Sequence, residues 1–127
     1  LYQFGDLARA TELIRVDFGA KLTIDVSPLT PSAENYCTTA WVKGEITYND
    51  GSKATLIYIK PCFLKGLSED VNGYHRKYPT FPHQCTTDQF FDEVQFEAYR
   101  ELGFQITHQL LKTELDIMGN TCDYNKP

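Results

Sequence analysis

The sequence lacks the features that mark several functional classes. It has no apolar run close to the about 20 residues that a membrane-spanning helix needs. Its 12 Lys and Arg residues are scattered and outnumbered by 17 Asp and Glu residues, and the resulting charge of −5 offers no basic surface to nucleic acid. It also contains no internal repeat and no low-complexity segment. We therefore expect no transmembrane segment, no nucleic-acid partner and no repeat architecture.

Cysteine and histidine are sparse as well. Four cysteines lie far apart in the sequence: Cys37, Cys62, Cys85 and Cys122. A chain of 127 residues can form a core without disulfides, so free thiols are favoured. His83, Cys85 and Asp88 offer a base, a nucleophile and an orienting carboxylate, or part of a zinc site. No second Cys/His pair accompanies them, so a hydrogen-bonded turn histidine is favoured, and neither a metal nor a cofactor is expected.

The composition is that of one globular domain, and the helices and the small antiparallel sheet predicted for it below make its fold class α+β. Hydrophobic residues make up 42% of the chain, including 8 Phe, 8 Tyr and 1 Trp, while 23% charged residues argue against disorder. The length suits one domain, either complete or part of a larger α/β domain. Any N-terminal targeting signal would precede Leu1, so the compartment stays open, with the cytoplasm favoured.

The N-terminal half predicts a helix followed by a small antiparallel sheet. Apolar residues at spacings of three and four predict a helix over about 6–18, with Asp6 at its start and Gly19 at its end. Residues 21–26 form a first strand. Residues 39–48 and 53–60 flank an Asp-Gly turn and form a hairpin. With Asp-Gly as a two-residue loop, three pairs face each other: Val42 with Ile59, Gly44 with Ile57, and Ile46 with Thr55.

The C-terminal half predicts a short helix and a long aromatic-rich helix. Ser68 caps the short helix, which Pro79 stops. Thr86-x-x-Gln89 has capping-box spacing for a helix from about 87 to the low 110s. Residues 119–127 are expected to be a flexible tail. Four aromatic residues extend around more of the long helix than one stripe needs, so a second surface should cover some of them: Phe90, Phe91, Phe96 and Tyr99.

Three stretches of sequence carry a resemblance to a known family. In residues 78–103, the turn Phe81-Pro-His83 leads into Asp88-Gln-Phe-Phe91 and Gln95-Phe-Glu-Ala-Tyr-Arg-Glu-Leu-Gly103. This pattern resembles the segment that bacterial patatin-like acyl hydrolases carry downstream of their catalytic core. Phe4-Gly-Asp-Leu-Ala8 with Ile14-Arg-Val-Asp-Phe-Gly19, and Leu56-Ile-Tyr-Ile-Lys-Pro61, resemble the same family in the same order, so the resemblance covers roughly residues 4–107.

The resemblance implies a role without chemistry for this chain. Patatin-like enzymes cleave lipid esters with a serine in Gly-x-Ser-x-Gly and an aspartate in Asp-Gly-Gly or Asp-Gly-Ala, and both would precede Leu1. The chain is then a non-catalytic C-terminal structural segment that packs against the N-terminal hydrolase core of the same polypeptide and meets lipid only through that parent. We expect no catalytic residue here. The candidates for contact with the core are His83, Asp88, Phe90, Phe96, Glu97, Tyr99 and Arg100.

Two other classes of function remain open. The first is a protein–protein interaction module that acts through the aromatic helix over 87–110, with a homodimer as the simplest assembly. The second, ranked last, is a thiol or metal enzyme at His83 and Cys85.

The scattered Cys and His residues predict that the chain binds no metal. Elemental analysis of the purified chain after dialysis should find no stoichiometric transition metal. Zinc at about one equivalent per chain, as a structural site would hold, would refute this prediction.

Overall fold

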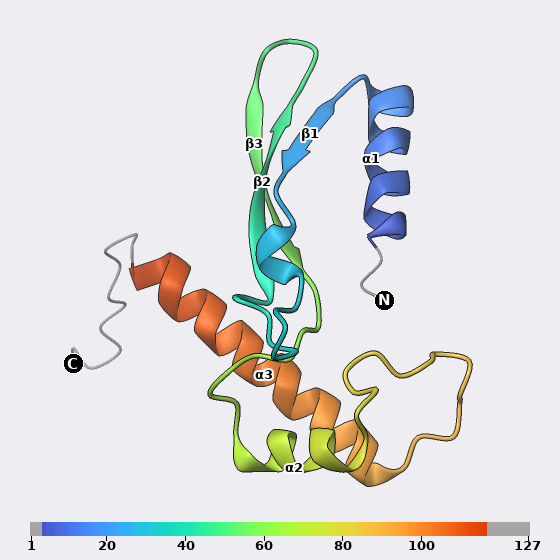
Figure 1. Ribbon diagram of the computed structural model, residues 1–127. Coiled ribbons are helices and arrows are strands. Elements are labelled where there is room, and N and C mark those ends of the chain that lie inside the picture. The colour runs from blue at the N-terminus through green and yellow to red at the C-terminus, as the bar shows by residue number, and fades with distance from the viewer. Residues whose placement is uncertain (1–3, 117–127) are drawn as a thin grey trace, which may run out of the picture. The chain divides into compact units, whose positions relative to one another are not determined.

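The computed structural model describes residues 4–116, and its elements confirm the α+β class. Three α-helices, a 3-10 turn and three strands follow one another along the chain: α1 (Gly5–Phe18), β1 (Lys21–Ile24), η1 (Ser27–Leu29), β2 (Trp41–Thr47), β3 (Lys53–Ile59), α2 (Glu69–Lys77) and α3 (Glu93–Asp116) (Figure 1). They form two compact units that divide between Lys65 and Gly66. The predicted tail over 119–127 lies outside the described residues.

Helix α1 ends as the sequence predicts and begins differently. Gly19 adopts the left-handed conformation with φ of 62°, and its amide donates to the carbonyl of Arg15 at 3.1 Å. Phe4, not Asp6, occupies the N-cap position, and Asp6 lies inside the first turn, where the helix dipole favours a carboxylate. Leu7 and Ile14 are half-buried, whereas Phe18, expected on the same stripe, is 74% exposed.

The first unit is built on a three-stranded antiparallel sheet with β2 in the centre. β1 pairs with β2 from Lys21 opposite Thr47 to Ile24 opposite Gly44, and β3 pairs with the other edge of β2. Helix α1 packs beside β1 (Figure 1). The predicted strand and hairpin are therefore present, with β1 two residues shorter at its end than expected.

The predicted register of the hairpin is wrong by one residue. Val42 pairs with Tyr58 and Gly44 with Leu56, because the loop has three residues instead of two. Tyr48 donates to the carbonyl of Ser52 at 2.9 Å, and the amide of Gly51, with φ of 82°, donates back to Tyr48 at 3.0 Å. A slip of one residue exchanges the faces of a strand. Leu56 and Tyr58 consequently share the more buried face with Val42, while two isoleucines lie on the other: Ile57, 44% exposed, and Ile59, 48% exposed.

In the first unit, the fully buried Leu29 of η1 contacts the segments that flank the hairpin. Its carbonyl oxygen accepts from the thiols of Cys37 at 3.2 Å and Cys62 at 3.7 Å. The amide of Cys37 donates to the carbonyl of Phe63 at 2.9 Å, which ties the segment before β2 to the segment after β3. Both cysteines are buried and unbridged, and Cys85 is exposed and also unbridged; Cys122 lies outside the described residues.

The second unit packs α2 against α3. Helix α3 contributes one apolar stripe of four buried residues, Ala98, Leu102, Ile106 and Leu110. The stripe was expected to begin at Phe91 and Val94, but both are exposed. Ser68 does precede α2, but it forms no side-chain cap, and its buried Oγ atom has no hydrogen-bond partner among the described residues. Its amide instead donates to Oε1 of Gln105 on α3 at 3.0 Å. The predicted cap is thus replaced by a bond between the two helices.

Helix α3 begins at Glu93 and not at about 87. Residues 86–92 form a loop in which aspartate side chains accept bonds from the backbone. Oδ1 of Asp88 accepts from the amide of Phe90 at 3.1 Å, and Oδ1 of Asp92 accepts from the amide of Gln95 at 2.7 Å. Asp92 therefore supplies the cap that the sequence analysis assigned to Thr86.

Two glycines should respond in opposite directions to substitution by alanine. Gly19→Ala should lower the free energy of unfolding by at least about 1 kcal/mol, because L residues avoid its φ of 62° and the new Cβ would lie within 3 Å of the Asn49 side chain. Gly103→Ala should raise it by up to about 1 kcal/mol, because Gly103 lies within α3 with nothing near its Cβ position. Urea unfolding followed by circular dichroism measures the free energy of unfolding of both variants. If both substitutions changed it in the same direction, this explanation would be contradicted.

Candidate interaction surface

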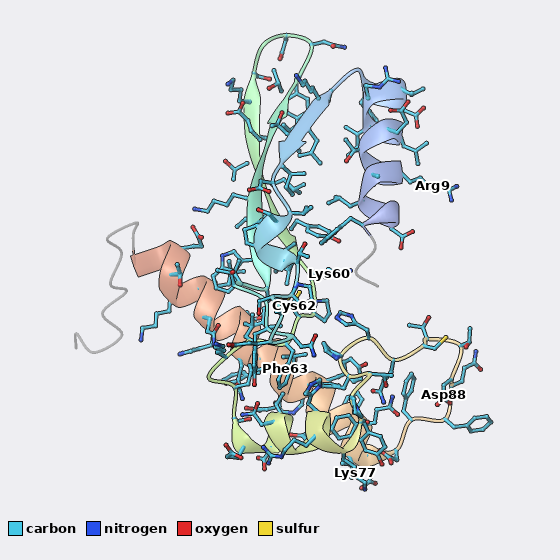
Figure 2. The ribbon with its side chains drawn as sticks, viewed as in Figure 1. Arg9, Lys60, Cys62, Phe63, Lys77 and Asp88 are labelled. Carbon is cyan, nitrogen blue, oxygen red and sulfur yellow. The ribbon has the colours of Figure 1, made fainter. Side chains whose placement is uncertain are left out.

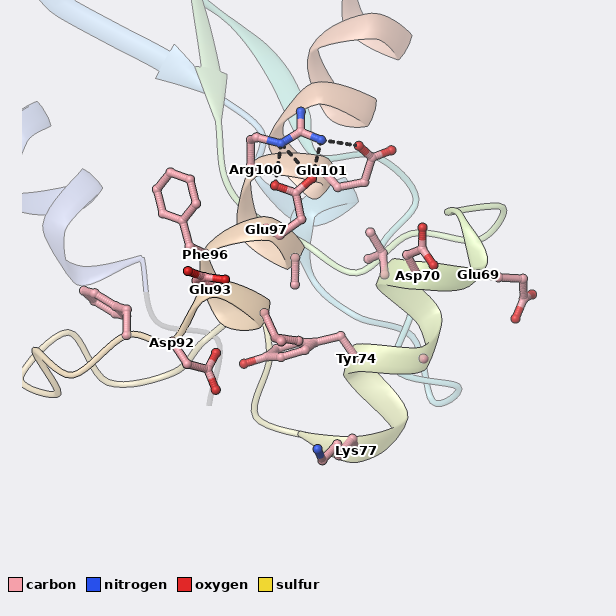
Figure 3. Close-up of a pocket in the computed structure, with 15 residues that line it drawn as sticks. Glu69, Asp70, Tyr74, Lys77, Asp92, Glu93, Phe96, Glu97, Arg100 and Glu101 are labelled. Atoms are coloured by element: carbon pink, nitrogen blue, oxygen red, sulfur yellow. Dashed lines mark hydrogen bonds and ion pairs between the residues drawn. The ribbon is translucent and has the colours of Figure 1, made fainter.

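An open groove of about 1160 Å³ runs along α2 and α3 in the second unit (Figure 3). Helix α2 and the start of α3 supply most of its lining, and the loop before α3 supplies the rest. Fifteen residues line it: Glu69, Asp70, Val71, Gly73, Tyr74, Lys77, Phe91, Asp92, Glu93, Val94, Phe96, Glu97, Ala98, Arg100 and Glu101.

The base of the groove is apolar and held by aromatic packing. Val71, Tyr74 and Ala98 are buried, and Tyr74 projects from α2 toward α3 (Figure 3). The Tyr74 ring meets the buried Phe81 ring edge-on at 5.1 Å, and Phe81 meets Tyr99 at 4.8 Å. Edge-to-face pairs at this separation are favourable beyond their burial. The turn around Phe81 therefore fixes how the first part of α3 lies against α2.

The turn after α2 is held by hydrogen bonds as well as by rings. Nδ1 of His75, on the last turn of α2, lies 2.9 Å from the carbonyl oxygen of Phe81. The amide of Gln84 donates to the hydroxyl of Tyr99 at 3.3 Å. Burial raises the pKa of the Tyr99 hydroxyl. His75 is half-buried, and nothing in its sequence neighbourhood predicts the contact with Phe81.

The rim of the groove is acidic. Six carboxylates line it against two cationic side chains, Lys77 and Arg100, so that the lining has a formal charge of −4. Arg100 binds Glu97 through Nε at 2.9 Å and Glu101 through Nη2 at 3.2 Å (Figure 3). The hydrogen bond from Arg100 lowers the pKa of the Glu97 carboxyl. The Glu97 carboxylate therefore stays ionised at neutral pH.

Three phenylalanines near the start of α3 are exposed, and together we call them the aromatic surface. Phe90 is 93%, Phe91 59% and Phe96 66% exposed. Phe96 lies on α3 with its ring directed away from α2 (Figure 3). Tyr99, the fourth aromatic residue of the predicted set, is half-buried against Phe81 and belongs to the interior of the unit. The aromatic surface therefore comprises residues of the loop and of the helix.

The residues of the predicted reactive cluster take part in local turns, and the amide of Asp88 donates to the carbonyl of Cys85 at 3.3 Å. The amide of His83 donates to the carbonyl of Thr80 at 2.6 Å, and Sγ of Cys85 lies 2.9 Å from Oγ1 of Thr87. Asp88 accepts from the backbone at Phe90 and lies on the loop ahead of α3 (Figure 2). Within residues 4–116, no three His, Cys, Asp or Glu side chains are placed to hold a metal ion.

The acidic groove was missed in the sequence analysis although part of its signal is visible there. Glu93, Glu97 and Glu101 recur at intervals of four, which places their carboxylates on one face of a helix. Such spacing is also typical of any solvent-exposed helix face, so by itself it does not predict a groove. Asp70 comes from α2, and only the packing of the two helices brings it to the same groove.

Comparisons with known proteins leave the family open. No protein-family model, no curated protein and no solved structure matches this chain. Among the described helices, none is long and apolar enough to cross a membrane.

The turn at Cys85 predicts a thiol that reacts at lower pH than an ordinary exposed cysteine. Hydrogen bonding with Thr87 lowers the pKa of the Cys85 thiol, so the thiolate that iodoacetamide alkylates forms at lower pH. Mass spectrometry of Cys85 across a pH series should give a midpoint below that of an exposed cysteine in a peptide, and Thr87→Val should raise it. An identical midpoint in the variant would contradict the assignment; the buried Cys37 serves as the unreactive reference.

Proposed function

We propose that this chain is a non-catalytic C-terminal structural segment of a patatin-like serine acyl hydrolase. The resemblance of residues 4–107 to that family supports the proposal. Within the stretch that has the most particular pattern, from Phe81 to Gly103, the Phe81 ring contacts Tyr99 on α3 at 4.8 Å. In the parent enzyme, a Ser-Asp dyad of the core would cleave the ester, and this chain would support the core without touching the reacting atoms.

The observation that carries the proposal is the exposure of the aromatic surface. Exposed phenylalanines that gather in one short segment, here residues 90–96, mark a surface that a second surface covers. A phenylalanine side chain buries roughly 150 Å² or more, so covering Phe90 and Phe96 supplies several kcal/mol toward association. We assign the hydrolase core as the partner, which contacts Phe90 and Phe96 and the adjoining turn at His83.

Two experiments test this assignment. The gene region upstream of the codon for Leu1 should encode Gly-x-Ser-x-Gly followed by Asp-Gly-Gly or Asp-Gly-Ala. When that region is expressed as a separate polypeptide, it should co-purify with this chain. The substitution Phe96→Asp should abolish co-purification, whereas Phe104→Asp should not, because Phe104 is equally a surface residue of α3, 60% exposed, but lies eight residues further along the helix, where it stacks on His108. An upstream region without these motifs would refute the assignment.

The same surface supports a second candidate, a protein–protein interaction module that associates with its own copies. Identical chains present identical apolar patches, and a two-fold axis pairs them. The third candidate, a thiol enzyme at His83 and Cys85, would need ester turnover that Cys85→Ala removes. Hydrolysis of p-nitrophenyl esters by the isolated chain, measured against a buffer blank, separates it from the other two.

Self-association of the isolated chain is expected at high concentration. Light scattering over a concentration series should show a dimer that Phe96→Asp dissociates by at least tenfold in the dissociation constant, since a charge replaces a buried ring. Phe104→Asp is the matched control. A wild-type chain that stays monomeric, with Phe96→Asp only unfolding it, would show that Phe96 is ordinary core and that the surface binds no copy.

A further inference from the structure

We propose that the groove between α2 and α3 binds a basic amphipathic helical segment of a partner protein. The inference rests on the proposed function only in taking the second unit as an interaction surface, and it adds the chemistry of the bound segment. The groove has the size for this role. A helix about 10 Å wide occupies about 120 Å³ per residue, so about 1160 Å³ accommodates roughly ten residues, or nearly three turns.

Charge selects a basic partner. The whole chain has a formal charge of −5, and the groove lining alone accounts for −4. Such a concentration of one sign attracts Lys and Arg side chains and repels phosphate groups, which opposes a lipid headgroup or a nucleic acid as the occupant.

Two carboxylates are placed to receive the cationic side chains of the partner. Asp70 on α2 and Glu93 on α3 line the groove, are exposed, and form no ion pair with any residue in the described part of the chain. Glu97 and Glu101 are already held by Arg100. Because Asp70 and Glu93 come from different helices, we expect them to bind residues of the partner on either side of its apolar face.

The apolar part of the groove selects an amphipathic partner. Val94 is 62% exposed and Phe91 59% exposed, and both line the groove above the buried Val71, Tyr74 and Ala98. A helix with leucines at intervals of three and four would cover Val94 and Phe91 while its flanking lysines reach the acidic rim. A cationic polymer without an apolar face would leave these side chains in water.

The test is a fluorescence-anisotropy titration of the full 127-residue chain. The probe is a labelled helical peptide of leucine and lysine with the leucines on one face; its comparison peptides have the leucines scattered, or glutamate in place of lysine. The first peptide alone should bind, and more weakly as salt rises from about 0.05 to about 0.5 M. Val94→Ser should weaken binding about fivefold, as should the pair Asp70→Asn and Glu93→Gln.

Matched variants make the outcome decisive. Val16→Ser changes a valine of α1 that is also 62% exposed, and the pair Glu12→Gln and Asp17→Asn removes two charges from α1. Both should leave binding within about twofold of wild type, with the fold of each variant verified by circular dichroism. Equal binding of the scattered or acidic peptide, or equal loss in the α1 variants, would overturn the proposal.

The peptide titration can fail independently of the proposed function. If the peptide does not bind while Phe96→Asp still abolishes co-purification with the hydrolase core, the groove proposal is wrong and the structural role stands. If the peptide binds as expected while Phe96→Asp leaves co-purification unchanged, the groove is a binding site and the assignment of the core to the aromatic surface is wrong.

Discussion

The edge-to-face chain of Tyr74, Phe81 and Tyr99 is the interaction on which the second unit depends. These rings come from α2, from the turn after it and from α3, so their packing decides where the two helices lie relative to each other. Tyr74 lines the base of the groove that lies between these helices. Phe90 and Phe91 of the aromatic surface belong to the exposed loop that ends where Asp92 caps α3.

The first unit depends on a different constraint, the satisfaction of buried backbone groups outside the sheet. The carbonyl of Leu29 lies in the interior and accepts from two thiols, which are weak donors but give this buried oxygen its hydrogen-bond partners. The hydrogen bond from the Cys37 amide to the Phe63 carbonyl then joins the segment before β2 to the segment after β3. Cysteine is suited to this position because its thiol is small, apolar in its packing and still able to donate.

Charge and apolar exposure give the two surfaces of the second unit different roles, although Phe91 and Phe96 belong to both. The aromatic surface is suited to a dry interface of the kind that holds parts of one protein together, whereas the acidic groove is suited to a segment of opposite charge that associates and dissociates. Arg100 belongs to the groove, where it partly neutralises Glu97 and Glu101 and so keeps the helix face from excessive repulsion. His83 and Asp88 serve the turn and loop that position both surfaces.

The sequence by itself determined the elements with strong local signals. Gly19 ends α1 because few other residues adopt its left-handed conformation, Pro79 confines α2, and the stripe from Ala98 to Leu110 identifies the buried face of α3. Only the tertiary structure decided the hairpin register, the start of α3 and the composition of the groove. An Asp-Gly turn is compatible with loops of two or three residues, competing aspartates can cap a helix at several positions, and carboxylates from separate helices meet only after packing has placed the helices together.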